Sequence, residues 1–384
     1  MTSYTQDNHG IVQNQSQWQL ARPLRALYMP PFPQQIPLDL RPIAHKPGIS
    51  LLWRRLRPWL MLGLSRQLEL QRERIPQRPQ RILWIYKGTP QVGDALMDLS
   101  SRVLLRGLPI QLELLTDANL AHLFAADDVF AAVHADGAQL HATDYDLIIL
   151  DSFKARCLQE KQNHFPRLPF VTMRGYFSGP EFNRTLFSFY RMKQLLDADR
   201  EADPALLKPH LLSAPQDRAR AAQLPIAPGA VAFAIGGAVA NRAYEKWDTV
   251  IADLLAHGKL QQAVLVGSDN ATAIAERVVI NGPRAGRIVN CVAQYSLLET
   301  LEIMKRCSLA VCCDGGLLHL ANSAGLPTLA LFDSKIVPDM RMTSANRYVA
   351  LQSTGIIDDL PAAQVTDAIA ETLAHYSSVA KPVA

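Results

Sequence analysis

The chain has 384 residues, of which 48% are hydrophobic and 19% are charged, and its net charge is +4. This length exceeds one ordinary core and suits two domains, while the low share of charged residues argues against disorder and against a nucleic-acid-binding protein. Residues 1–80 hold 11 Lys and Arg against 4 Asp and Glu, so this segment carries +7 and the remaining 304 residues carry −3.

The five cysteines follow no recurring spacing, which is typical of small buried residues in a cytosolic protein rather than of a disulfide framework. They are Cys157, Cys291, Cys307, Cys312 and Cys313. Residues 1–19 are polar and unlike a signal peptide, and no run of about 18 apolar residues occurs. We therefore expect the protein on the cytoplasmic side of the membrane.

Residues 1–80 form a basic N-terminal extension that we expect to be partly disordered or membrane-facing. Residues 1–50 are rich in Pro and Gln, whereas residues 49–74 interleave Leu and Trp with arginines at 54, 55, 57 and 66. This second composition predicts a basic amphipathic helix, interrupted near Pro58. Two interpretations stay open: a helix lying on an anionic membrane surface, or a helix packed on the protein with its arginines in water.

The folded structure is expected to begin at Arg81, with strands and helices that alternate. Strands are predicted at 82–86, 111–115, 147–150 and 169–172, and helices at 94–106 and 118–126. Such alternation is typical of a parallel, doubly wound sheet, here a domain over residues 81–215. The Pro-rich stretch 197–228 is interpreted as the connection to the next domain.

A second alternating series fills residues 216–384. Strands are predicted at 231–235, 263–266, 287–289, 309–313 and 327–332. Helices are predicted at 245–257, 271–279, 297–306, 317–324 and 362–375. The fold class is therefore α/β, with two Rossmann-like parallel-sheet domains that face each other across a cleft.

The segment from Cys312 to Phe332 has the pattern of a ligand site. A strand ends at Cys313 and a helix begins near Gly316, so Asp314 lies at the carboxyl end of the strand. Gly315 and Gly316 allow a close backbone approach, and the unpaired amides of a helix start attract a phosphate or diphosphate. His319, one turn into the helix, can reach back toward that ligand. The alternative is an Asp that only caps the helix.

This segment resembles the C-terminal signature of glycosyltransferase family 9, the heptosyltransferase-like enzymes. The matching residues are Asp314, Gly316, His319, Ala321, Ala324, Gly325 and Pro327. Gly315 stands where the family often has a hydroxyl residue, which removes one hydrogen bond to a donor phosphate. The resemblance implies a fold of the GT-B type, with the nucleotide-sugar donor in the second domain and the acceptor in the first.

A second match lies at Gly93-Asp94, after the first strand and a loop, where the family has Gly-Asp before an apolar helix. The resemblance implies that Asp94 is the catalytic base. Inverting sugar transfer needs a carboxylate that takes the proton from the attacking acceptor hydroxyl. Taken alone, Asp94 would be read as a helix cap.

A third match runs from Gly236 to Trp247 and includes Gly237 in a loop of small residues. In the family a basic residue precedes the Trp that opens the next helix. Lys246, with Arg242 as its rival, therefore resembles the residue that neutralises the diphosphate leaving group, where a metal ion would otherwise act. The alternative for Lys246 is a solvated side chain on the first helical turn.

Two acids and several cations complete the predicted site. Asp269 and Glu276 both qualify as the acid near the donor nucleoside, and either can instead be an ordinary helix-start acid. Acidic, phosphorylated glycolipids are the acceptors in the family, so we expect cations of the first domain to bind the acceptor, unless they are ordinary surface charges. The acceptor candidates are Lys87, Lys154, Arg156 and Arg174.

The resemblance thus predicts an inverting, metal-independent glycosyltransferase that moves a heptose from ADP-heptose onto a lipopolysaccharide core or a related surface glycan. We expect no cofactor, no metal site, no nucleic acid partner, and peripheral contact with the inner membrane. The sequence has no Asp-x-Asp metal motif in a convincing place. It also lacks His and Cys at the spacing of a zinc site and a Gly-x-x-x-x-Gly-Lys-Ser/Thr phosphate-binding loop. The alternatives are a hexosyltransferase or nucleotide-sugar epimerase of the same fold, or a catalytically silent relative that binds glycan or nucleotide.

Overall fold

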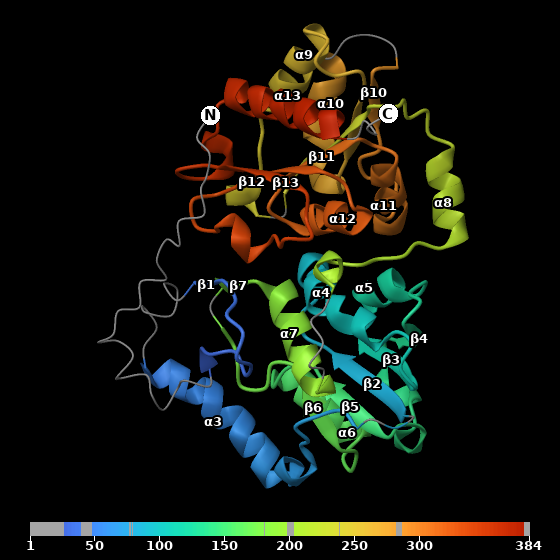
Figure 1. Ribbon diagram of the computed structural model, residues 1–384, viewed down its shortest axis with the longest axis vertical. Coiled ribbons are helices and arrows are strands. Elements are labelled where there is room, and N and C mark those ends of the chain that lie inside the picture. The colour runs from blue at the N-terminus through green and yellow to red at the C-terminus, as the bar shows by residue number, and fades with distance from the viewer. Residues whose placement is uncertain are drawn as a thin grey trace.

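The structure, a computed structural model, describes residues 27–39, 48–76, 78, 80–179, 181–197, 203–237, 239–281 and 286–379. Two parallel sheets with helices on their faces form two domains, drawn one above the other in Figure 1. The prediction of two Rossmann-like α/β domains is confirmed.

The first domain is built on five parallel strands in the order β4-β3-β2-β5-β6. Their bounds are β2 Gln80–Tyr86, β3 Ile110–Thr116, β4 Phe130–His134, β5 Leu147–Leu150 and β6 Phe170–Thr172. The helices are α4 Val92–Asp98, α5 Ala118–Ala121, α6 Ala155–His164 and α7 Arg184–Leu196. Helices cover both faces of the sheet, so central strand β2 is buried on both sides and is almost wholly apolar in sequence.

The second domain is built on six parallel strands in the order β10-β9-β8-β11-β12-β13. Their bounds are β8 Val231–Ala234, β9 Ala263–Val266, β10 Ile288–Asn290, β11 Leu309–Cys313, β12 Thr328–Phe332 and β13 Tyr348–Gln352. The helices are α9 Trp247–Ala256, α10 Thr272–Asn281, α11 Leu297–Lys305, α12 Gly316–Ala324 and α13 Ala362–Val379. Cys312 and Cys313 belong to different apolar clusters, as neighbours on one strand should.

Several elements differ from the prediction. The helix predicted at 94–106 divides into α4 and a 3-10 segment at Ser100–Leu105. The 197–228 connection includes a helix, α8 Pro215–Ala222, which packs against α11. The sequence prediction also missed the strands β4 and β13 and the amphipathic helices α6 and α7.

The N-terminal extension is partly packed on the first domain. Strand β1 (Leu38–Asp39) pairs with β7 (Glu181–Phe182), and Phe32 and Ile36 join the aromatic cluster of Phe182. Residues 1–26 and 40–47 of this extension, which was predicted to be partly disordered or membrane-facing over residues 1–80, lie outside the described residues.

Helix α3 (Gly48–Leu64) lies on the flank of the first domain (Figure 1). The predicted interruption near Pro58 is wrong, because the helix continues through Pro58 to Leu64. A proline removes the hydrogen bond to the carbonyl four residues earlier. That carbonyl belongs to Arg54, an exposed residue, so water can take its place.

The two domains meet through α4 and α12, which lie beside each other at the junction (Figure 1). One buried apolar cluster contains residues of both sheets, such as Trp84 of β2 and Cys312 of β11. The side chain of Asn183 also joins the domains, since its Nδ2 donates to the carbonyls of Asp339 and Met342 at 2.7 and 2.8 Å. The junction is therefore a packed contact with polar links.

Within the described ranges, no helix is both long enough and apolar enough to cross a bilayer. The five cysteines are buried and unpaired, as the sequence predicted.

Candidate active site between the two domains

The starts of α4 and α12 touch each other, and a glycine makes this contact possible. A Cβ atom placed on Gly93 would lie 3.0 Å from Cδ2 of His319 and 3.3 Å from Cα of Gly316. Any larger residue at 93 would push the two helix starts apart. The next residue is Asp94, so the contact brings the predicted base to the edge of the predicted diphosphate site.

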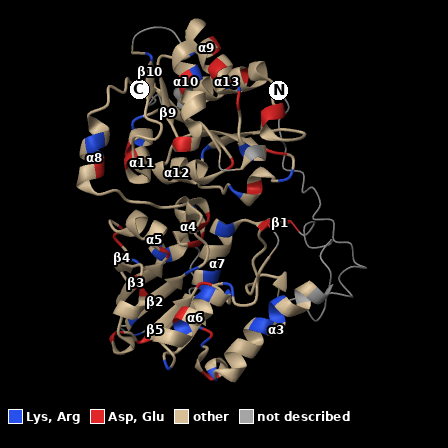
Figure 2. Cartoon of the chain, turned by 180° about the vertical axis from the view of Figure 1, so that it is seen from behind, with Lys and Arg blue, Asp and Glu red and all other residues tan. Residues whose placement is uncertain are grey.

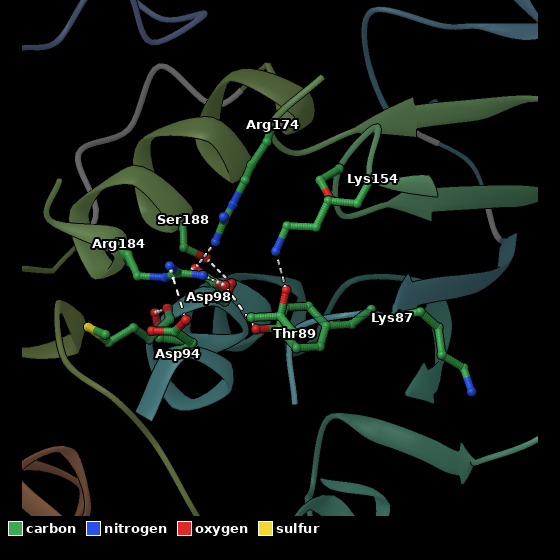
Figure 3. Close-up of polar contacts among 12 residues, drawn as sticks. Lys87, Thr89, Asp94, Asp98, Lys154, Arg174, Arg184 and Ser188 are labelled. Carbon is green, nitrogen blue, oxygen red and sulfur yellow. Dashed lines mark hydrogen bonds and ion pairs between the residues drawn. The ribbon is translucent and has the colours of Figure 1, made fainter. Parts of the chain in front are cut away.

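Asp94 lies at this junction, and its carboxylate is partly exposed to solvent. Its side chain is 31% exposed, and its Oδ2 lies 3.2 Å from Nη1 of Arg184. Arg184 is the first residue of α7 and is itself held by Asp98, through bonds of 3.0 Å from Nε and 2.7 Å from Nη2 (Figure 3). Asp94 and Asp98 are one helical turn apart, so a single guanidinium spans both carboxylates.

Asp98 is the buried anchor of this network. Burial alone would raise the pKa of its carboxyl, but Arg174 and Arg184 together lower the pKa to about 2. The hydroxyl of Tyr86 donates a further hydrogen bond to Asp98 at 2.9 Å. Asp98 therefore stays ionised and fixes Arg184 beside Asp94.

A second buried carboxyl, Asp151, follows β5 at the same edge of the sheet. Burial raises the pKa of Asp151 to about 6; Arg174 opposes this rise, and the nearby charge of Asp98 adds to it. Perturbed carboxyls of this kind concentrate at functional sites. No sequence motif pointed to Asp151 or Asp98.

Across the junction, Asp314 follows β11 as predicted but is a buried anchor for two arginines. Its Oδ1 accepts from Nε of Arg341 at 2.9 Å, and its Oδ2 lies 3.3 Å from Nη1 of Arg242. Arg341 also donates to Glu181 of the first domain at 2.7 Å, which ties the two domains together. The Arg242 side chain is 31% exposed and is the more accessible of the two cations.

His319 is buried beside this pair and its imidazole is neutral at physiological pH. Burial lowers the pKa of His319 to about 4, with a further contribution from the charge of Arg341. Its Nδ1 is buried and makes no hydrogen bond within the described part of the chain. A buried polar nitrogen without a partner is costly, so a ligand atom or water at this point would be stabilising.

The helix start itself leaves room for a ligand on the Gly315 side. A Cβ on Gly315 would meet nothing closer than a backbone oxygen at 3.9 Å, and its φ of 175° is ordinary extended backbone. The first amides of α12 have no partner within the helix. Together with Arg242, they can hold an anion such as a diphosphate.

Lys246, the first choice for the leaving-group cation, is engaged elsewhere. It precedes α9, and its ammonium donates to the carbonyl of Asp358 and, at 3.1 Å, to that of Leu360. Between the two rival cations, Arg242 is the one in contact with Asp314.

The other predicted donor residues lie on the loops around β8 and β9. Gly237 packs against the Arg242–Ala243 backbone, where a Cβ would come within 3.2 Å. Asp269 lies in a short 3-10 turn after β9 and Glu276 lies on α10, and both are exposed. No contact brings either acid to Asp314.

The predicted acceptor cations fall into two groups. Arg174 contacts Asp98, and Lys154 donates to the hydroxyl of Thr89, next to the Asp94 network. Burial and the charge of Arg174 lower the pKa of Lys154. Lys87 instead points away from that network (Figure 3), and with Arg156 it lines a polar pocket of about 590 Å³.

Sequence reasoning missed the residues that connect the predicted ones. No sequence motif distinguishes Arg184 from the other cations of the first domain, and neither Glu181 nor Arg341 belongs to a recognised motif. Asp98 could have been noticed, since it repeats Asp94 at a spacing of four residues on one helix face. Arg341 lies 27 residues after Asp314, and only the fold brings them together.

Comparisons with known proteins identify the fold and the family that part of the chain matches. Residues 189–354 match the model of glycosyltransferase family 9 (heptosyltransferase). No curated protein sequence matches the chain. Among solved structures, a glycosyltransferase family 9 protein from Veillonella parvula has a TM-score of 0.65 at 16% identity, over 79% of this chain and 100% of that one.

Two E. coli structures are also similar. ADP-heptose lps heptosyltransferase II has a TM-score of 0.61 at 16% identity, over 77% of this chain and 99% of its own. Heptosyltransferase WaaC with ADP has a TM-score of 0.57 at 15% identity, over 76% of this chain and 99% of its own. At these identities the likeness establishes the fold.

The two-domain fold and the junction site define the class of protein: a glycosyltransferase with GT-B architecture. Residues 189–354 match the model of glycosyltransferase family 9, the heptosyltransferase family, so the resemblance predicted from the Asp314 and Gly236–Trp247 motifs is confirmed, while the Gly93-Asp94 motif lies outside the matched residues.

Proposed function

We propose that this chain is an inverting, metal-independent glycosyltransferase that moves a heptose from ADP-heptose onto a lipopolysaccharide core or a related surface glycan. The family model supports the transfer of heptose, and the E. coli structures with similar folds are named as an ADP-heptose lps heptosyltransferase and as a heptosyltransferase with ADP. The support for a reaction at the junction is geometric.

The single observation that carries the proposal is the contact of Gly93 with the start of α12. It brings Gly93, the residue before Asp94, against the helix start of the matched signature, Asp314-Gly315-Gly316, which supports a role for Asp94 there. A single displacement requires a base on one side and a diphosphate-binding site on the other, because the hydroxyl attacks the anomeric carbon opposite the leaving group.

In the proposed reaction, Asp94 accepts the proton of the acceptor hydroxyl while its oxygen attacks the anomeric carbon. The bond from that carbon to the diphosphate oxygen breaks, and the negative charge that develops there is stabilised by the amides of Gly315 and Gly316 and by Arg242. A fixed guanidinium does electrostatically what a metal ion does in other transferases, which supports metal independence. His319, neutral and with a free Nδ1, can hydrogen-bond the donor.

Arg242 takes the place of Lys246 in this proposal. Lys246 bonds two backbone carbonyls, whereas Arg242 stands at Asp314 with a third of its side chain in solvent. Lys246 then stabilises the loop that carries Arg242. Asp269 and Glu276 stay candidates for the donor nucleoside.

On the acceptor side, Lys154 and Arg174 contact Thr89 and Asp98 in the network that includes Asp94, and Lys87 and Arg156 line the polar pocket. These four cations would face an acidic acceptor. With such a glycolipid acceptor, the transfer reaction would take place at the cytoplasmic face of the inner membrane, and the protein would contact this membrane peripherally.

The test is a donor panel. ADP-, UDP- and GDP-sugars are added to the full chain, and the thermal midpoint and the transfer to a core acceptor are measured with and without a chelator. ADP-heptose should give the largest thermal shift and turnover that survives chelation. Turnover lost on chelation contradicts metal independence, and binding without turnover for every donor indicates a silent relative.

A further inference from the structure

Helix α3 turns its apolar face toward solvent. Leu52, Leu56, Trp59 and Leu60 follow the spacing of one helical stripe, and Trp53 and Leu64 extend it. Trp53 is 59% exposed, Trp59 51% and Leu64 84%. A helix of a soluble domain normally buries such a stripe.

The orientation of α3 is fixed from the opposite side. Leu62 is 1% exposed and packs into the core of the first domain, and Nε2 of Gln162 on α6 donates to the carbonyl of Met61 at 3.1 Å. Trp53 lies nine residues before Leu62, which is about half a turn round the helix. Trp53 therefore points away from the body of the protein, and the rest of the exposed apolar face extends from it toward the side of Leu62.

The charge of this helix has one sign. Arg57 is exposed at the border of the apolar stripe, Arg54 is exposed farther round the helix, and Arg66 follows the helix end. Figure 2 shows basic residues along α3. Residues 48–66 contain no Asp or Glu. The surface thus combines tryptophan, leucine and positive charge.

We propose that α3 lies in the surface of an anionic lipid bilayer, with Leu52, Trp53, Leu56, Trp59, Leu60 and Leu64 among the acyl chains and the arginines at the phosphate level. Helices that lie in the membrane plane have this division of apolar and basic residues, and tryptophan favours the interfacial depth. The inference goes beyond the proposed reaction, because lipid binding needs neither donor nor acceptor.

Charge argues for a bilayer over a second copy of the chain. A symmetric contact through this face would bring the arginines of two copies together without any acid of α3 to compensate them. Anionic headgroups supply the missing negative charge, at about 1 kcal/mol for each arginine near the surface.

The experiment is cosedimentation of the full chain with phosphatidylcholine vesicles that contain or lack phosphatidylglycerol. The wild type should bind the anionic vesicles, and the double substitution Trp53→Ser and Trp59→Ser should lower the partition coefficient at least tenfold. The matched control is Val279→Ser with Ile280→Ser, which removes two exposed apolar side chains of α10 and should bind like the wild type. All four side chains are exposed, so folding is expected to be retained.

Substitution of Arg54 and Arg57 by Gln should weaken binding to anionic vesicles about fivefold per arginine and remove the preference over neutral ones. The proposal is overturned if the wild type ignores anionic vesicles, or if the tryptophan variant binds them unchanged. It is also overturned if light scattering without lipid shows a dimer that the tryptophan variant dissociates. Transfer to a soluble acceptor should be unaffected by these variants, so failure here is separate from failure of the proposed reaction.

Discussion

The two sides of the junction are built differently. On the first domain, α4 carries acids that are paired with arginines: Asp98, at its end, is buried between Arg174 and Arg184, and Asp94, near its start, is the most exposed of these four side chains. On the second domain, the start of α12 has open backbone amides beside Gly315 and one accessible cation, Arg242. The first side is suited to hold one carboxylate in place, and the second is suited to receive an anion.

The difference also follows the sequence comparison. The family model covers residues 189–354, which include α12 and the whole second sheet but only the end of α7 from the first domain. The proposed diphosphate site thus lies within the residues that match the family model, and the proposed acceptor side lies mostly outside them. Four predictions sharpen this contrast.

The largest effect is expected for Asp94→Asn. Without a carboxylate to take the acceptor proton, kcat should fall about a thousandfold, while the donor dissociation constant should stay within about twofold. Single-turnover transfer and calorimetric titration with donor measure the two quantities. Asp128→Asn, an exposed acid far along the chain, serves as the control, and full turnover by the Asp94 variant would remove it from the mechanism.

The second prediction compares the two cations of the donor side, Arg242 and Lys246. Arg242→Ala should weaken donor binding and lower kcat/KM about a hundredfold, because it removes the charge that faces the diphosphate. Lys246→Ala should lower kcat/KM less than tenfold and mainly lower the thermal midpoint, since it loses two carbonyl contacts. A larger kinetic loss for Lys246 than for Arg242 would restore the sequence-based assignment.

Arg184 is a positioning residue in this account. Arg184→Gln should reduce kcat about tenfold with an unchanged donor KM, because Asp94 loses the guanidinium that orients it. Arg184→Lys should recover part of kcat, since a cation is restored without the two-point contact to Asp98. Equal losses in both variants, or a loss in KM alone, would show that Arg184 is only structural.

The smallest effect concerns Gly315→Ser. The position has room for a side chain and an ordinary backbone conformation, so the variant should fold normally. A hydroxyl here adds one hydrogen bond to a charged phosphate and should tighten donor binding about fivefold. Titration with ADP measures the change, and weaker binding would mean that the diphosphate does not lie beside residue 315.

The fold was predictable because its central strands are continuous apolar runs between loops. β5, β9 and β11 have the predicted bounds, and Gly316 begins α12 as expected from Asp314-Gly-Gly. Edge strand β13 was missed because its residues are only half-buried and lack a strand pattern. Pro58 misled the prediction of α3, because the helix continues through this proline, whose lost bonding partner is the carbonyl of the exposed Arg54.

The site was predictable only where a motif is local. Asp94 and Asp314 stand in short patterns next to a strand, and the structure brings their helices into contact. The pairs Arg341–Glu181 and Arg184–Asp98 join residues 160 and 86 positions apart, and no local pattern contains such pairs. The choice between Arg242 and Lys246 depends on side-chain direction, which residue spacing alone does not determine.

The most direct test of the central claim is a crystal structure of the full chain with ADP. The account predicts the diphosphate within about 3 Å of the Gly315 and Gly316 amides and in contact with Arg242, with the Asp94 carboxylate on the facing side of the junction. A nucleotide bound elsewhere, or an Asp94 carboxylate turned away from the diphosphate, would contradict it.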